Sequence, residues 1–181
     1  MLRTDAARNA DTVLATAAQL LAANPAASMA EIARAAGLDR STVYRRFPSR
    51  DALVTAMFAA KLDAAEQALD DARVETAPFT VAVHRFLEEM IQVGRRWPVD
   101  MSLLLQDEPS RNRHDEQRAR VERLVERGIR DGAVRDDLPS GWACDVLLAL
   151  LDLAIHKYQD LEPGPAADLV MESFLHLGRA G

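Results

Sequence analysis

Apolar residues recur at spacings of three and four along most of the chain, which is the pattern of amphipathic helices. The first such segment runs from about residue 5 to residue 23, and its apolar side chains share one face: Val13, Ala17, Leu20 and Leu21. Asn24 and Pro25 follow it. Proline cannot continue a helix and asparagine tolerates the left-handed conformation of a helix terminus, so this pair predicts the end of the first helix.

Two short helices around a glycine turn are predicted next. Ser28 and Glu31 lie three apart, as in a capping box, where each side chain satisfies a free backbone N–H of the other residue. We expect this second helix to start at Ser28 and to stop at Gly37. Asp39 is placed to cap a third helix over residues 40–47, which completes a helix-turn-helix.

The third predicted helix has one apolar and one polar face. Val43 and Phe47, four apart, are expected to anchor it to the first two helices. The polar side chains suit a DNA groove, because arginine bonds guanine bidentately, serine and threonine bond bases or phosphates, and tyrosine reaches phosphates. They are Arg40, Ser41, Tyr44 and Arg45, flanked by Thr42 and Arg46. The alternative is a helical hairpin whose basic face is merely solvated.

Pro48 and Ser49 are expected to close the third helix and to cap a fourth one. Arg50 then lies in the first turn of that fourth helix. A cation at this end opposes the helix dipole. We therefore predict that Arg50 serves a DNA phosphate rather than the helix.

The pattern in the remaining two thirds of the chain predicts a helical bundle. Helices are expected at 50–72, from 78 to about 97, at 115–131, at 141–158 and from about 166, and a short segment is expected at 99–106. The helix at 141–158 is apolar nearly all round, so it must be covered on more than one side. We expect its second face, with the last helix beside it, to contact a partner copy through Leu147, Leu148, Leu151, Ile155 and Phe174. Alternatively, both helices fill the core of a monomer.

Composition supports an all-α fold of about nine helices. The 181 residues include 32 Ala and 23 Leu but only 13 Val and 4 Ile, an excess of helix formers over β-branched residues. No apolar run approaches the roughly 18 residues of a membrane span, and charges interrupt the first ten residues. We expect a cytoplasmic protein without a membrane partner. The lone cysteine, Cys144, agrees with a reducing compartment.

The net charge of −6 is unevenly distributed along the chain. Residues 1–51 carry seven arginines and five acidic residues, whereas residues 52–181 carry 15 basic and 23 acidic ones. Only the first quarter of the chain can therefore approach phosphates without general repulsion.

Catalytic and metal sites find little support in the sequence. No serine lies in a nucleophile motif, the glycines are scattered, and Cys144 lies in an apolar helix. His84 and Glu88 are four apart, as are Asp152, His156 and Asp160, but two or three such ligands without a further one nearby are more often a solvated ion pair. We predict no enzyme activity, no metal site and no cofactor.

Residues 8–58 carry a series of short motifs that resemble the DNA-binding domain of the TetR family of transcriptional repressors. They are Ala17-Ala18, Glu31-Ile32-Ala33, Ala36-Gly37-Leu38, Ser41-Thr42-Val43-Tyr44-Arg45-Arg46-Phe47 and Ser49-Arg50-Asp51-Ala52-Leu53. The family often has Lys in place of Arg50 and Gly near Asn24, and both replacements preserve the physical role. The motifs cover under a third of the chain, but their spacing is specific.

The resemblance implies a repressor that binds a palindromic double-stranded DNA operator as a homodimer. It gives base-reading or groove-lining positions to Arg40, Ser41, Tyr44 and Arg45, and phosphate-clamping positions to Thr42, Tyr44 and Arg50. It also implies a helix-turn-helix DNA-binding domain over residues 1–51 and a ligand-binding and dimerisation domain over residues 52–181.

Members of this family typically hold a small effector in the C-terminal bundle. Flexible and aromatic side chains there are the candidate lining: Phe86, Met90, Trp97, Met101, Leu104 and Trp142. Such residues are more often plain core than pocket. We expect an apolar or amphipathic effector that releases the repressor from DNA. Two alternatives remain, a ligand-binding or enzymatic bundle with an incidental helix-turn-helix and a DNA-binding regulator without an effector.

Overall fold

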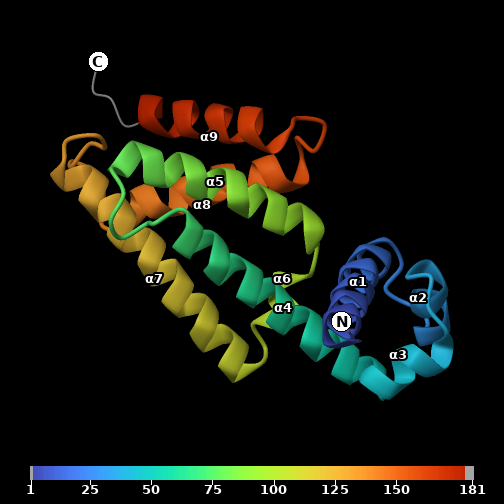
Figure 1. The fold of residues 1–181 in the computed structure, drawn as a ribbon. Helices are drawn as coiled ribbons and strands as arrows, with labels where there is room; N and C mark the ends of the chain where they lie inside the picture. The colour runs from blue at the N-terminus through green and yellow to red at the C-terminus, as the bar shows by residue number, and fades with distance from the viewer. Residues whose placement is uncertain (1, 178–181) are drawn as a thin grey trace. The chain divides into compact units, whose positions relative to one another are not determined.

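The computed structural model describes residues 2–177, with the side chains of residues 10–176, and within that range it contains nine helices and no strand (Figure 1). They are α1 (Leu2–Ala23), α2 (Met29–Ala35), α3 (Arg40–Arg46), α4 (Arg50–Asp71), α5 (Phe79–Arg96), α6 (Met101–Leu104), α7 (Glu108–Arg130), α8 (Trp142–His156) and α9 (Pro163–Leu177). The predicted all-α class is confirmed. No helix in the described range is long and apolar enough to cross a membrane.

The local signals around α2 act as predicted. The Ser28 hydroxyl accepts a hydrogen bond from the Glu31 amide at 3.3 Å, and the Glu31 carboxylate accepts one from the Ser28 amide at 2.7 Å. Gly37 is left-handed, with φ +69°, and the Leu38 amide donates to the Ala33 carbonyl at 3.0 Å, which ends the helix in a Schellman turn. The capping box and the glycine turn are both confirmed.

Two helix ends lie where the sequence predicts them but are formed by other interactions than expected. Asp39 occupies the N-cap position of α3, but its side chain makes no capping hydrogen bond. Asn24 ends α1 without a left-handed backbone, because its side chain instead accepts a hydrogen bond from the Ala26 amide at 3.1 Å. Both predictions were right in position and wrong in mechanism.

Helix α7 begins seven residues before its predicted start at residue 115. The Asp107 carboxylate accepts hydrogen bonds from the Ser110 amide at 3.0 Å and from its hydroxyl at 2.8 Å, which caps the first turn. Pro109 is tolerated there because amides of the first turn need no helical acceptor. The polar stretch before residue 115 concealed this start, since its sequence has no apolar periodicity.

The chain forms two compact units. The first comprises residues 1–63 and 96–111, and the second comprises residues 64–95 and 112–181. Helix α4 therefore contributes to both units. The units do not divide at the boundary expected at residue 51, because the first part of α4 and the segment around α6 pack with the helix-turn-helix. The functional division at that residue stays a prediction.

Contacts between α1 and the end of α5 join the distant segments of the first unit. Arg96 and Asp11 form an ion pair of 2.5 Å, and the side chain of Gln19 donates to the Arg96 carbonyl at 3.3 Å. Trp97 is buried, with the Arg96 guanidinium 5.6 Å from its ring centroid. These contacts explain why the segment after α5 packs with the helix-turn-helix.

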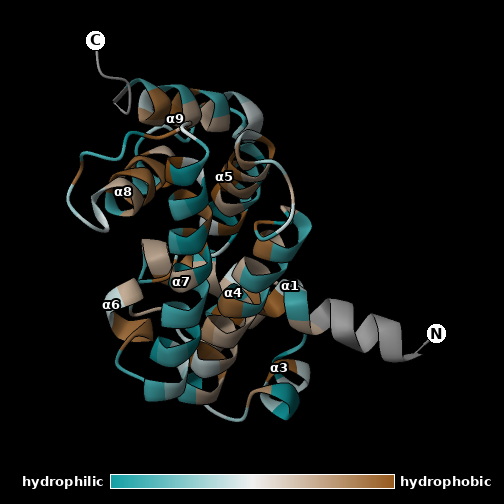
Figure 2. Cartoon of the chain, turned by 90° about the vertical axis from the view of Figure 1, so that its left-hand side faces the viewer, coloured by the Kyte–Doolittle hydropathy of each residue, from teal (hydrophilic) through white to brown (hydrophobic). Residues whose placement is uncertain are grey.

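The second unit has a continuous apolar core contributed by the end of α4 and by α5, α7, α8 and α9. The apolar stripe of α7 faces this core, and Figure 2 shows the hydrophilic character of its outer side. Two glycines permit close helix contacts. A Cβ atom on Gly94 would lie 2.6 Å from Ile155 Cδ1, and one on Gly128 would lie 2.5 Å from Phe79 Cζ.

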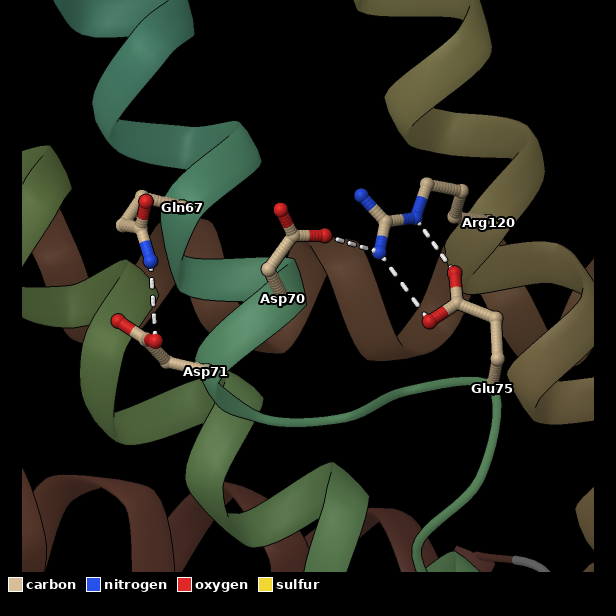
Figure 3. A network of polar contacts seen from close by, with 5 residues as sticks. All are labelled: Gln67, Asp70, Asp71, Glu75 and Arg120. Atoms are coloured by element: carbon tan, nitrogen blue, oxygen red, sulfur yellow. Dashed lines mark hydrogen bonds and ion pairs between the residues drawn. The ribbon is translucent and has the colours of Figure 1, made fainter.

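Arginines on α7 fasten the connection between α4 and α5. Arg120 contacts the Asp70 carboxylate at 2.7 Å and the Glu75 carboxylate at 2.6 Å (Figure 3). Arg127 donates to the backbone carbonyls of Glu75 at 2.6 Å and Ala77 at 2.8 Å. The hydrogen bond from Arg120 lowers the pKa of Glu75, so this carboxylate stays charged and keeps its partner at neutral pH.

A guanidinium from α5 fixes the end of α8. Arg95 donates to the carbonyls of Leu161 at 2.6 Å, Tyr158 at 3.0 Å and Ala154 at 3.3 Å. Carbonyls at a helix C-terminus lack amide partners within the helix and carry partial negative charge, so a cation is favourable there. Arg95 therefore stabilises the turn that leads from α8 to α9.

The predicted partner-contacting residues of α8 and α9 require a correction. Four of the five are buried in the core of the single chain: Leu147, Leu151, Ile155 and Phe174. Only Leu148 is partly exposed. The apolar character of α8 extends almost all round the helix, so the sequence pattern did not reveal which face the other helices cover.

Candidate nucleic-acid interface

Helix α3 presents the polar face that the sequence predicted. Val43, with 1% of its surface exposed, and Phe47 are buried in the first unit. Each such burial contributes about 1.5–3 kcal/mol to folding, which fixes the rotation of the helix. The side chains on the other faces are exposed or half-buried: Arg40, Ser41, Thr42, Tyr44, Arg45 and Arg46.

Arg40 and Tyr44 contact each other one helical turn apart. The Arg40 guanidinium lies 5.0 Å from the centroid of the Tyr44 ring, and its Nη2 atom lies 3.5 Å from the phenol oxygen. This cation–π contact restrains two long side chains on the exposed face. Less conformational entropy is then lost when they meet a ligand.

Arg45 and Arg46 supply positive charge at the end of α3. Both are exposed, and neither forms an ion pair or hydrogen bond with another side chain in the described part of the chain. Their guanidinium groups are therefore free to bind an anion or a guanine edge.

Arg50 has partners that the sequence could not reveal. Its guanidinium donates to the backbone carbonyl of Pro25 at 2.5 Å and to that of Ala27. The prediction that this residue serves a phosphate was argued from the helix dipole, and it stays a prediction. The acceptors lie 23 and 25 residues earlier in the chain, so only folding brings them to Arg50.

The expected effector-lining residues are divided between the two units. Phe86, Met90 and Trp142 belong to the second unit, and Trp97, Met101 and Leu104 belong to the first. Phe86 lies in the apolar core with Met90 packed against it. Trp142 is 54% exposed, which contradicts its expected place in an enclosed lining.

Helices α8 and α9 pack against each other, and both carry exposed apolar side chains. They are Trp142 and Leu153, 43% exposed, on α8 and Leu169, 47% exposed, on α9. Leu153 and Leu169 were absent from the predicted contact set. The polar residues Asp145, Asp152 and His156 recur at helical spacing on α8, and this signal could have identified the outward face.

Two histidines outside α3 pair with carboxylates. His84 lies 2.9 Å from Asp168, and His156 lies 3.3 Å from Asp152. Burial raises the pKa of the Cys144 thiol to about 11, so it is not a thiolate at neutral pH. No group of three or more metal-binding side chains occurs among the described residues.

Comparison with known proteins connects this surface to a family. The sequence profile of the bacterial regulatory proteins of the tetR family matches residues 13–57, which extend from α1 into α4. The HTH-type transcriptional repressor LfrR of Mycolicibacterium smegmatis is 31% identical over 160 residues, which cover 86% of this chain and 82% of LfrR. The chain belongs to the TetR family.

Solved structures agree with membership of the TetR family. The crystal structure of LfrR from Mycobacterium smegmatis in complex with proflavine matches with a TM-score of 0.72 and 26% identity, over 96% of this chain and 98% of that one. The ketosteroid transcriptional regulator KstR2 of Mycobacterium tuberculosis matches with a TM-score of 0.77 and 17% identity, over 93% and 94%. At that identity the second match shows a shared fold alone. This TetR-family protein is a transcriptional regulator.

Proposed function

We propose that this TetR-family regulator is a repressor that binds a palindromic DNA operator as a homodimer and is released by a small molecule. The observation that carries the proposal is the free polar face of α3, opposite the buried Val43. The relative LfrR is named a transcriptional repressor, which supports repression rather than activation. Such a regulator acts in the cytoplasm, where its operator lies.

The side chains of α3 divide between base reading and phosphate binding. Arg40, Ser41 and Arg45 are exposed and would read base edges in the major groove. Thr42 and Tyr44 are half-buried, and their hydroxyls would bind backbone phosphates and set the register of the helix on DNA. DNA binding would then belong to residues 1–51.

Residues 52–181 would provide dimerisation and effector binding. The exposed apolar side chains Trp142, Leu153 and Leu169 lie on α8 and α9, and a partner copy would cover them. A two-fold dimer presents two identical copies of α3, which suits half-sites one helical turn, roughly 34–36 Å, apart.

Effector release would act by a shift between two arrangements of the dimer. The relative LfrR has been crystallised with proflavine, a planar aromatic cation. This supports an amphipathic effector for the protein described here. A ligand that prefers the arrangement with wrongly spaced α3 helices lowers operator affinity by its differential affinity for the two arrangements.

Binding-site selection from a random pool of duplex DNA tests the proposed function. We expect the selected sequences to contain an inverted repeat whose half-sites are centred about 10 base pairs apart or a multiple of that distance. Affinity for the selected duplex should fall steeply as salt rises. Recovery of no common sequence, together with salt-independent binding, would contradict DNA recognition by this protein.

Arg45→Ala is expected to weaken binding to the selected operator by about 1–3 kcal/mol and to relax the base preference in each half-site. The reason is that its guanidinium is exposed, with no side-chain partner among the described residues, and is therefore free to bond a guanine edge. Fluorescence anisotropy titrations against the operator and single-base variants measure both effects. Arg130→Ala, at the exposed end of α7, makes the same change in charge and should leave affinity unchanged. Equal effects of the two substitutions would exclude a base contact by Arg45.

A further inference from the structure

Arg40 and Tyr44 lie one turn apart on the polar side of α3, and Arg40 is the first residue of this helix. Side chains on a helix lean toward its N-terminus, so the ring of Tyr44 covers the turn that contains Arg40. The guanidinium carbon of Arg40 lies 5.0 Å from the ring centroid, and its Nη2 atom lies 3.5 Å from the phenol oxygen. We call this contact the Arg40–Tyr44 pair.

The ring of Tyr44 is the more constrained member of the Arg40–Tyr44 pair. Tyr44 directly follows the buried Val43 and is itself half-buried, whereas Arg40 is exposed. A tyrosine side chain has few rotatable bonds, while arginine is among the side chains that lose most rotamer freedom when they are ordered. The ring therefore provides a fixed surface that restricts the directions available to the Arg40 guanidinium.

The contact leaves the positive charge of Arg40 available to DNA. In the described part of the chain, its guanidinium contacts an uncharged ring rather than a carboxylate. A carboxylate partner would neutralise the charge that attracts DNA, and a guanine edge would have to displace it. A cation–π contact restrains the side chain without either effect. The other N–H donors of the guanidinium can still bond a base.

The hydroxyl of Tyr44 can contact two neighbours at once. Its oxygen accepts from Nη2 of Arg40, which leaves the O–H hydrogen to donate to an acceptor outside the pair. In the proposed complex with DNA, that acceptor is a phosphate oxygen. Tyr44 would then connect the DNA backbone to the side chain that reads a base.

We propose that Tyr44 is a positioning residue for base reading by Arg40. The ring directs the Arg40 guanidinium from the N-terminal end of α3, which is the part of a recognition helix that contacts base edges. Arg45 has no side-chain partner among the described residues, so it reads its base independently of Tyr44. The inference rests on the proposed function, because it concerns how the same face of α3 recognises DNA.

The test uses the operator recovered by binding-site selection and duplexes in which single base pairs are changed. Arg40→Ala and Arg45→Ala each identify the base pair that the arginine reads, as the position at which the variant no longer prefers the selected base. Anisotropy titrations then measure the preference of Tyr44→Leu and Tyr44→Phe at both positions. Tyr44→Phe is the matched control, because it keeps the ring and removes only the hydroxyl.

Tyr44→Leu should lower the preference at the Arg40 position by about two- to fivefold, which is the effect of losing one exposed cation–π contact. The preference at the Arg45 position should not change. Tyr44→Phe should keep both preferences and weaken binding to operator and scrambled duplex alike, since it loses only a phosphate contact. Combining Arg40→Ala with Tyr44→Leu should give the same preference as Arg40→Ala alone, because the ring acts through Arg40.

An unchanged preference at the Arg40 position in Tyr44→Leu would overturn the inference. An equal loss at the Arg45 position would also overturn it, because α3 as a whole would then be displaced, as would an equal loss in Tyr44→Phe or an Arg40→Ala variant with wild-type base preferences. Circular dichroism checks the fold, and Tyr44→Met, which also lacks the aromatic face, decides if Tyr44→Leu does not fold. A wild-type protein that selects no duplex would instead overturn the proposed function, and the inference with it.

Discussion

The double substitution Leu153→Glu with Leu169→Glu is expected to convert the proposed dimer into a monomer and to weaken operator binding by about 10²–10⁴-fold. The two leucines are 43% and 47% exposed on the outward faces of α8 and α9. In a two-fold dimer the same patch of both copies forms the interface, so four new carboxylates would gather in one interface and their repulsion would add to the lost apolar burial. A monomer has one copy of α3 and loses the gain in affinity from linking two half-site contacts.

Sedimentation velocity measures the oligomeric state, and anisotropy with the selected operator measures the loss of affinity. Val81→Glu is the matched control, because Val81 is a 40% exposed apolar residue on α5, outside the proposed interface. It should leave both quantities unchanged. A double variant that remained dimeric would place the interface on another face of the molecule.

Gly128→Ala is expected to lower the free energy of unfolding by about 2–3 kcal/mol. The new methyl group on α7 would lie 2.5 Å from Cζ of Phe79, well inside van der Waals contact. Phe79 is buried in the core of the second unit and cannot move without displacing its neighbours. For a chain of this size, the melting temperature should fall by roughly 4–12 °C.

Gly164→Ala separates this steric effect from helix propensity. A Cβ atom at Gly164, in α9, would meet only a Glu88 carboxylate oxygen at 3.6 Å, an ordinary contact. Alanine favours a helix over glycine, but its Cβ is disfavoured in a helical residue directly before Pro165, so Gly164→Ala should change the free energy of unfolding by less than about 1 kcal/mol. Urea denaturation compares the two variants. Equal free energies of unfolding of the two variants would show that α7 and Phe79 can move apart with little loss of stability.

Local signals were sufficient to predict the helix-turn-helix. The Ser28–Glu31 capping box depends on residues three apart, and the turn at Gly37 needs a residue that tolerates positive φ. Val43 and Phe47 are four apart and define the buried side of α3. Each of these features involves neighbours in the chain, so the sequence pattern contains the physical cause of the structure.

Interactions between distant segments were not predictable in the same way. The α7 start at Glu108 was missed because its cap is formed by Asp107 and Ser110 within a polar stretch. The Arg96–Asp11 ion pair, with partners 85 residues apart, helps to place the segment after α5 in the first unit. A charge pattern cannot specify such a partner until the chain has folded.

The amino-acid sequence alone determined that this protein is helical, where most of its helices begin and end, and which side of α3 is free to meet DNA, because periodicity and capping are local properties. Only the tertiary structure decided that Arg50 binds two backbone carbonyls and that Leu147, Leu151, Ile155 and Phe174 lie inside the chain's own core. It also decided that Leu153 and Leu169 face outward. A side chain's partners and the covered face of an apolar helix depend on which distant segments pack against it.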